Sequence, residues 1–213
     1  MFNKLALVTA VAVISTAASA GGLTFKAGLG YIDPTASKNM GDVSTPDGFE
    51  KVEVSGEAAL LPSFDYRFGN SPFSAELLLA TPSTHTITAL FDGVRDEVAT
   101  VKQLPPTLTF KYNTPSWHGI SANAGLGATV FIPYEAKSVA GDGSVTKLDV
   151  DTKVAPAAQL GVSWSPASSN WGVFADARYA KLKTKVTDKT DNANLGNLEI
   201  DPVVYSIGVS HKF

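Results

Sequence analysis

The chain has 213 residues, with 17 Lys and Arg against 20 Asp and Glu, so it is of single-domain size with a formal net charge of −3. It has no basic excess and no His/carboxylate spacing suited to a metal, so nucleic acid, metal ions and other cofactors are not expected. It contains no cysteine, which excludes disulfides, a thiol nucleophile and a cysteine metal centre.

The N-terminus is typical of a secretory signal peptide. Lys4 is the only charge in the first 25 residues, and an apolar run from Leu5 to Ala18 is relieved only by threonines and a serine. Ala18-Ser19-Ala20 then matches the small-x-small cleavage pattern. The run is too short for a spanning helix. We therefore expect a signal peptide over residues 1–20 and one domain over 21–213, the alternative being an uncleaved anchor.

Alternation of apolar with small or polar residues predicts eight strands after this leader, because successive strand side chains point to opposite faces. They are Leu23–Tyr31, Glu57–Phe68, Phe73–Ala80, Gln103–Tyr112, Ile120–Ile132, Pro156–Trp164, Trp171–Ala180 and Asp201–Phe213. Short turns are predicted at Gly69–Pro72, Asn113–His118 and Ser165–Asn170. Long polar loops are predicted at Asp33–Lys51, Thr81–Val101, Glu135–Lys153 and Thr184–Glu199. The second of these is mixed in character and could contain a short helix or an extra strand.

Long and short connections alternate along this series, and aromatic residues gather at the short-turn ends of the strands. The aromatic set is Phe64, Tyr66, Phe68, Phe73, Tyr112, Trp164, Trp171 and Phe213. Short periplasmic turns, longer outer loops and an interfacial aromatic girdle are features of outer-membrane barrels. The sequence thus predicts an all-β fold, an eight-stranded antiparallel transmembrane β-barrel with short periplasmic turns and four longer extracellular loops. The alternative is a soluble sandwich or lipocalin-like barrel, which would bury the apolar face.

Four stretches resemble the outer membrane protein W (OmpW) family, and the similarity runs over the whole mature chain in order. They are Leu77–His85, Gln103–Thr109 with its Leu-Pro-Pro-Thr-Leu core, Ala124–Ala128 and Asp201–Val204. The resemblance implies an eight-stranded barrel for passage of small hydrophobic compounds, with an apolar lumen and a lateral opening as the proposed exit. The chain departs from the usual outer-membrane pattern at His211, where Tyr or Phe is common.

The inward-facing positions near the short-turn end carry five basic and three acidic residues. They are Lys26, Asp65, Arg67, Glu76, Lys111, Asp176, Arg178 and Lys212. An eight-stranded barrel is just wide enough for side chains to fill, so these residues are expected to pair across the lumen as a charged plug. The alternative is that they only stabilise the barrel, because buried charges need partners in any protein.

Toward the outer end the inward positions become apolar. They include Ile32, Ala59, Leu61, Leu78, Ala80, Pro105, Phe131 and Leu182. An apolar lumen below polar loops suits a hydrophobic ligand, and we take Ile32, Leu61, Leu78, Pro105 and Phe131 as its candidate lining. Simple packing of these side chains against one another is the other interpretation.

Four prolines lie in or just beyond the outer halves of three adjacent predicted strands: Pro62, Pro82, Pro105 and Pro106. Proline has no N–H for a ladder hydrogen bond and belongs at sheet edges or bulges. We therefore predict a local break in the wall above the plug, through which a hydrophobic solute leaves sideways into the membrane.

Enzyme chemistry is not expected, because no predicted geometry brings a His to a Ser with a carboxylate behind it. The rival function is a structural or receptor barrel whose loops bind external partners without transport.

The expected location is the bacterial outer membrane. Expected partners are outer-membrane lipid and lipopolysaccharide, small hydrophobic solutes and, through the terminal Phe213, the barrel-assembly machinery.

Overall fold

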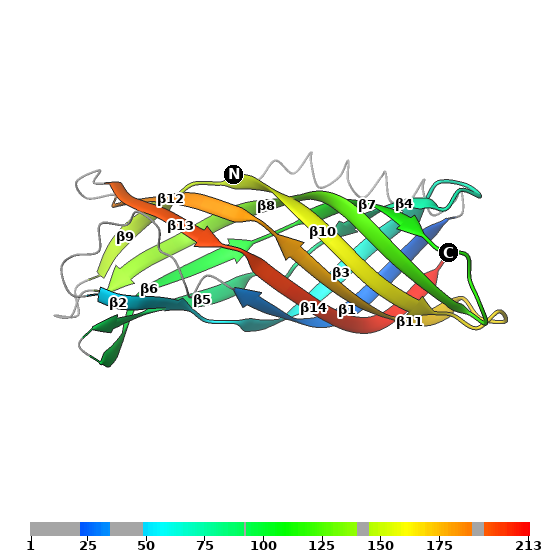
Figure 1. The fold of residues 1–213 in the computed structure, drawn as a ribbon, viewed down its shortest axis with the longest axis horizontal. Coiled ribbons are helices and arrows are strands. Elements are labelled where there is room, and N and C mark those ends of the chain that lie inside the picture. Colours follow the sequence, from blue (N-terminus) through cyan, green and yellow to red (C-terminus); the bar gives the residue numbers. More distant parts are fainter. Residues whose placement is uncertain (1–21, 35–48, 92, 140–144, 189–193) are drawn as a thin grey trace.

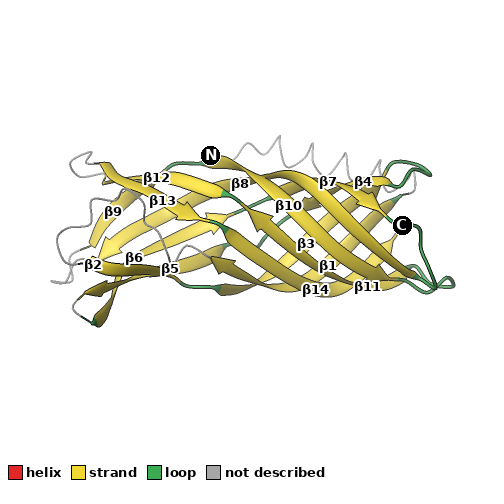
Figure 2. Cartoon of the chain, in the orientation of Figure 1, coloured by secondary structure: helices red, strands yellow, loops and turns green. Residues whose placement is uncertain are grey.

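A computed structural model describes residues 22–34, 49–91, 93–139, 145–188 and 194–213. They form one long tube made of strands, closed over its barrel part (Figures 1 and 2). In chain order the strands are β1 Leu23–Pro34, β2 Phe49–Val54, β3 Glu57–Arg67, β4 Phe73–Leu78, β5 Ser83–Phe91, β6 Val94–Leu104, β7 Thr107–Asn113, β8 Ile120–Val139, β9 Val145–Val150, β10 Lys153–Trp164, β11 Trp171–Ala180, β12 Leu182–Asp188, β13 Asn194–Ile200 and β14 Pro202–Lys212. Within the described residues there is no helix long and apolar enough to cross a membrane. The predicted signal peptide lies outside them.

Eight of these strands close the barrel, in the order β1, β3, β4, β7, β8, β10, β11 and β14, with antiparallel pairing throughout. Pairing of β14 with β1 completes the ring, with Gly28 opposite Gly208 and Tyr31 opposite Tyr205. The predicted eight-stranded antiparallel barrel is therefore confirmed. Closure removes both sheet edges, so the ring leaves no row of unpaired backbone groups toward lipid.

The described parts of the four long connections form strands, where the sequence predicted loops and allowed an extra strand only in Thr81–Val101. They contain β2, the β5–β6 hairpin, the outer part of β8 with β9, and the β12–β13 hairpin. These strands pair in the order β2, β5, β6, β8, β9, β12 and β13, and so continue the wall beyond the barrel. Figure 1 shows this extension at the end of the tube opposite the C-terminus.

The sense of the side-chain alternation inverts between the barrel and this extension. In the barrel, apolar side chains face outward, such as that of Leu126, which is 74% exposed. In the extension, apolar side chains face inward and form a buried cluster of Val101, Phe131, Ala136, Ala155, Leu182 and Ile200. Its outer surface carries ion pairs instead, such as Glu135 with Lys137 (2.9 Å) and Lys102 (3.2 Å). The alternation inverts because the outer face of the barrel contacts lipid, whereas the outer face of the extension contacts water.

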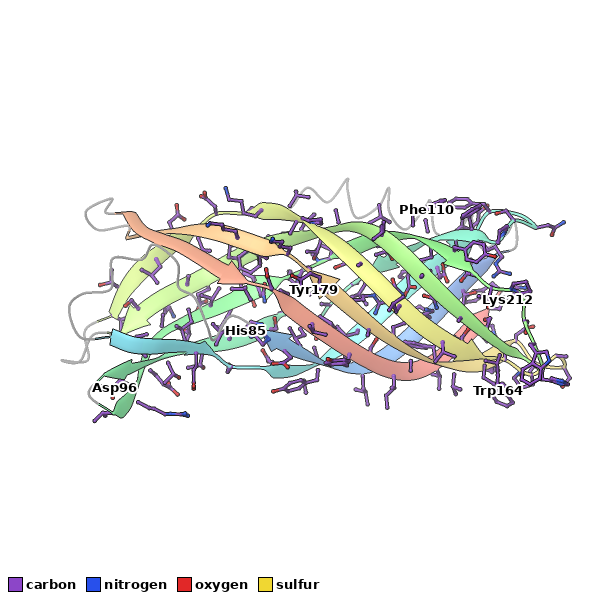
Figure 3. The ribbon with its side chains drawn as sticks, viewed as in Figure 1. His85, Asp96, Phe110, Trp164, Tyr179 and Lys212 are labelled. Atoms are coloured by element: carbon purple, nitrogen blue, oxygen red, sulfur yellow. The ribbon has the colours of Figure 1, made fainter. Side chains whose placement is uncertain are left out.

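An aromatic band surrounds the short-turn end of the barrel. Phe73 and Phe68 both stack on Phe110, with ring centroids 5.4 and 5.9 Å apart. On the other side of the closing strand His211 lies between Trp171 (4.7 Å) and Phe213 (4.8 Å). Figure 3 shows Phe110, Trp164 and Lys212 at this same end of the tube. The imidazole of His211 therefore takes an aromatic position in this band.

Candidate functional site

A buried carboxylate stands at the centre of the barrel lumen. Glu76 on β4 is 0% exposed, and its Oε1 accepts a hydrogen bond from Arg178 at 2.7 Å. Its Oε2 accepts from Lys26 at 3.1 Å and is also paired with Lys111. The three cations come from β11, β1 and β7, so Glu76 ties together strands from across the ring.

Two further carboxylates complete the charge balance. Asp176 pairs with Lys26 and Arg178, each at 3.2 Å, and Asp65 pairs with Lys111 at 2.7 Å. We call these six residues the ion-pair network: Lys26, Asp65, Glu76, Lys111, Asp176 and Arg178. Three cations meet three carboxylates, so the group is formally neutral. Pairing of opposite charges offsets the free-energy cost of removing these side chains from water.

The structure separates two of the eight predicted plug residues from this network. Arg67 and Lys212 are exposed and lie nearer the short-turn mouth of the lumen. Alternation assigned both to the inner face, but it says nothing about how far along the lumen each side chain reaches.

Neutral side chains that sequence reasoning did not single out also hold the network. Ser63 donates to Glu76 at 2.6 Å, and Gln159 donates to it at 3.1 Å while accepting from Thr109 at 2.7 Å. The Lys26 ammonium lies 4.8 Å from the centre of the Phe174 ring, within cation–π range. The signal that could have found Ser63, Thr109 and Gln159 is their inward position on predicted strands, next to the charged residues.

Glycines leave room for two of the charged side chains. A Cβ at position 161 would overlap Asp176 Oδ1, and a Cβ at position 125 would lie 2.7 Å from Lys111 Cγ. Gly125 and Gly161 are on β8 and β10. Their role is therefore to let the network fill the narrow lumen.

On the short-turn side of the network lies a polar cavity of about 150 Å³. Lys26, Asp65 and Lys111 of the network line it, together with Arg67, Lys212 and a set of Ser, Thr and Asn side chains. Asn123 contributes a buried Oδ1 atom that has no protein partner. The lining suits water, and the cavity forms the periplasmic mouth of the lumen.

On the outer side of the network lies an apolar cavity of about 50 Å³. All five candidate lining residues, Ile32, Leu61, Leu78, Pro105 and Phe131, meet at it, and Arg178 of the network contributes to its wall. A cavity of about 150 Å³ is needed to hold benzene in a comparable apolar site. The cavity must therefore widen to admit a solute of that size.

The strand ladder is interrupted beside this cavity. Pairing of β4 with β7 ends at Leu78 and Thr107, and pairing of β5 with β6 begins at Ser83 and Gln103. We call the unpaired stretches 79–82 and 104–106 the proline seam, because they contain Pro82, Pro105 and Pro106. Their other edges stay bonded: Leu79 N donates to Pro62 O at 2.8 Å, and Val130 N donates to Pro106 O at 2.9 Å. Pro62 itself pairs with Ala27 and lies outside the seam.

The structure brings His85 next to a serine, which the sequence did not predict. His85 lies on β5 rather than in a loop, with Nε2 3.3 Å from Ser83 Oγ and Nδ1 2.8 Å from the Ser55 carbonyl oxygen. A backbone carbonyl stands where a hydrolase has a carboxylate, and both side chains are buried. Among the described residues there is also no cluster of three or more His, Cys, Asp or Glu that could hold a metal.

Comparison with known proteins agrees with this architecture. The model of the OmpW family matches residues 19–213. Outer membrane protein AlkL of Ectopseudomonas oleovorans is 26% identical over 219 residues, covering 91% of each chain. The crystal structure of OprG from Pseudomonas aeruginosa superposes with a TM-score of 0.72 at 22% identity, covering 91% of this chain and 96% of that one. Outer Membrane Protein W of E. coli gives 0.60 at 22% identity, covering 91% and 98%. The chain is therefore an outer-membrane β-barrel that belongs to the OmpW family.

Proposed function

We propose that this barrel passes small hydrophobic molecules across the outer membrane. The observation that carries the proposal is the apolar cavity, where inward side chains of Ile32, Leu61 and Leu78 meet above a buried ion-pair network. An apolar site enclosed by a barrel wall suits a hydrophobic ligand and gives a polar one few partners. The family resemblance implies the same class of solute.

The ion-pair network makes a straight path to the periplasm unfavourable for such a solute. An apolar molecule that moved past Glu76 would have to separate it from Lys26, Lys111 and Arg178, and would offer no hydrogen bonds in exchange. Leaving buried charges unpaired costs several kcal/mol, about 3–5 in comparable buried pairs. The network therefore acts as the plug.

The proline seam supplies a sideways route at the level of the cavity. Pro105 and Leu78 line both the cavity and the seam's edge. Opening the seam breaks no ladder bond between stretches 79–82 and 104–106, because none joins them, while the bonds to β3 and β8 remain. A solute held in the cavity then leaves into the lipid.

The test is uptake of radiolabelled n-dodecane into vesicles with a lipopolysaccharide outer leaflet. Leu61→Asp or Leu78→Lys places a charge in the apolar cavity, and the initial rate is expected to fall at least about tenfold, the effect of about 1.4 kcal/mol. The control is Val145→Asp, at a position 59% exposed on the outer strand β9. Rates equal to wild type for both cavity variants would show that the solute does not use the cavity.

One observation favours the rival function, a structural or receptor barrel. The cavity of about 50 Å³ is too small for most solutes without rearrangement. Wild-type vesicles separate the two functions directly. Dodecane uptake no faster than in vesicles carrying an unrelated closed small barrel would support the receptor barrel.

A further inference from the structure

A second interruption of the wall lies away from the proline seam, where β11 gives way to β12 and β13 gives way to β14. Pairing of β11 with β14 ends at Tyr179 and Val203, and pairing of β12 with β13 begins at Leu182 and Ile200. Residues 180–181 and 201–202 are therefore not paired with each other. The other edge of 180–181 is bonded, because Lys181 N donates to Pro156 O at 3.1 Å, whereas Pro202 is the register partner of Pro34 on β1 and neither proline has an N–H to donate. We call this interruption the Tyr179 seam.

A single carboxylate closes the Tyr179 seam in place of the ladder. Asp201 Oδ1 accepts from the Leu182 backbone N–H at 3.1 Å, and Oδ2 accepts from the Tyr179 hydroxyl at 3.1 Å. Tyr179 is 41% exposed on the outer face, whereas Leu182 is 3% exposed inside. The Asp201 side chain thus joins a residue of the outer surface to one of the lumen.

The apolar cavity reaches this seam. Its lining includes Tyr179 together with the inward residues Ala180, Leu182, Ile200 and Pro202. From the proline seam only Ala80 and Pro105 take part, both on the inner face, and the outward-facing Leu79 does not. Tyr179 is thus a lining residue whose side chain lies on the outer face, between the inward residues Arg178 and Ala180, so the cavity borders the wall at this seam. Figure 3 shows Tyr179 partway along the tube, between the end that carries Lys212 and the end that carries Asp96.

We propose that the Tyr179 seam is a lateral exit from the cavity and that Tyr179 is the residue that closes it. The proposal rests on the proposed function, since it concerns the same cavity and solute. When the Tyr179 hydroxyl leaves Asp201, the ring can turn away within the outer surface. The opening is then bordered by Ala180, Leu182 and Pro202, whose apolar side chains suit a narrow aliphatic chain and offer it no hydrogen bond.

The depth of the seam fits release into lipid. Tyr31 and Tyr205 are cross-strand partners on β1 and β14, both outward-facing and about half exposed, and Tyr205 lies two residues beyond Val203, the partner of Tyr179. Exposed tyrosines at the far end of an apolar band mark the membrane interface. Because β14 runs toward the short-turn end, residues 201–202 lie on the outer side of Tyr205, and a solute that leaves past Tyr179 emerges in the headgroup region at the outer boundary of the membrane.

The experiment compares Tyr179→Phe and Tyr179→Ala with the matched pair Tyr205→Phe and Tyr205→Ala, in the n-dodecane vesicle assay. Tyr205 has the same residue type and the same outward face, but it does not line the cavity. Tyr179→Phe removes only the hydrogen bond to a carboxylate, and loss of such a bond changes a two-state population about tenfold. Uptake is expected to rise by up to about that factor in both Tyr179 variants and to stay at the wild-type rate in the Tyr205 variants.

A blocking arm uses the absence of native cysteine. Tyr179→Cys is alkylated with a bulky maleimide, which should lower uptake below the unlabelled variant, whereas the same label on Tyr205→Cys should not. Wild-type uptake with no effect at position 179 in any arm overturns the Tyr179 exit and leaves the proposed function in place. Absence of uptake in wild type and every variant overturns both. A Tyr179→Ala variant that does not fold leaves Tyr179→Phe and the labelling arm to decide.

Discussion

Glu76 holds the lumen together because it is the one acceptor shared by all three cations of the ion-pair network. Its other partners, Ser63 and Gln159, are neutral and bond the same two oxygens. A residue with this many partners is structural and functional at once. The network that stabilises the barrel is also what separates the apolar cavity from the polar one.

Replacing Glu76 with Gln keeps the shape but leaves three buried cations with two carboxylates. Because removal of one partner strands a buried charge, we expect the free energy of unfolding to fall by roughly 3–5 kcal/mol. Urea titration of the barrel in lipid vesicles, followed by Trp fluorescence, measures this change.

The same Glu76 variant should also admit ions, with a preference for anions, because its lumen carries an uncompensated positive charge. Planar-bilayer conductance tests this second effect. Glu135→Gln is the control, since Glu135 makes solvent-exposed pairs with Lys102 and Lys137 on the outer extension. Exposed pairs contribute little, so its unfolding midpoint should not move. Equal behaviour of the two variants would mean that Glu76 is not the centre of the network.

At the scale of elements, the wall has two seams and each is closed differently. At the proline seam the sequence removes N–H donors, so the ladder cannot form between 79–82 and 104–106. At the Tyr179 seam a carboxylate side chain takes the place of the ladder. The interruption at the proline seam is a fixed property of the backbone. The Tyr179 seam can open when the hydrogen bond from the Tyr179 hydroxyl to Asp201 breaks.

Restoring donors at the proline seam should close it. Pro105→Thr together with Pro106→Val restores both missing N–H groups, the first on the edge that faces 79–82 and the second on the edge that faces β8, and dodecane uptake is expected to fall severalfold. Adding the maleimide-labelled Tyr179→Cys should reduce it further, toward the rate of empty vesicles, because both exits are then blocked. Pro166→Thr is the control, because Pro166 lies in the short turn between β10 and β11, at the other end of the barrel. An unchanged rate in the Pro105/Pro106 variant would remove the proline seam from the route.

At the scale of the whole molecule, the barrel ladder is closed around the ring on the short-turn side of the two seams. Lipid-facing strands of this kind cannot open locally without exposing backbone groups to hydrocarbon. We expect the protein to migrate as a compact band on an SDS gel without heating and to shift to its full-length position after boiling. A single band in both lanes would contradict a stable closed barrel. The Glu76→Gln variant should make the shift at a lower temperature.

The eight barrel strands could be read from the sequence because each keeps one apolar and one small or polar face. The outer extension could not be read in the same way. Val101 and Ala136 are apolar residues that face the lumen there, while Lys102 and Glu135 face outward, so the pattern inverts within a continuous strand. A segment that faces water with a core of its own looks polar overall, and this is why Glu135–Lys153 was predicted as a loop and Thr81–Val101 as a connection of mixed character.

Alternation along each strand determined which residues of this protein face the lumen, because the side-chain period of a strand is two. It placed the six network residues and the five cavity residues on the inner face without any tertiary information. Only the tertiary structure decided their depth, because strand tilt and register set which inward residues share a level of the barrel. That is why Arg67 and Lys212 fall outside the network, why Gln159 falls inside it, and why Asp201 meets the Tyr179 hydroxyl.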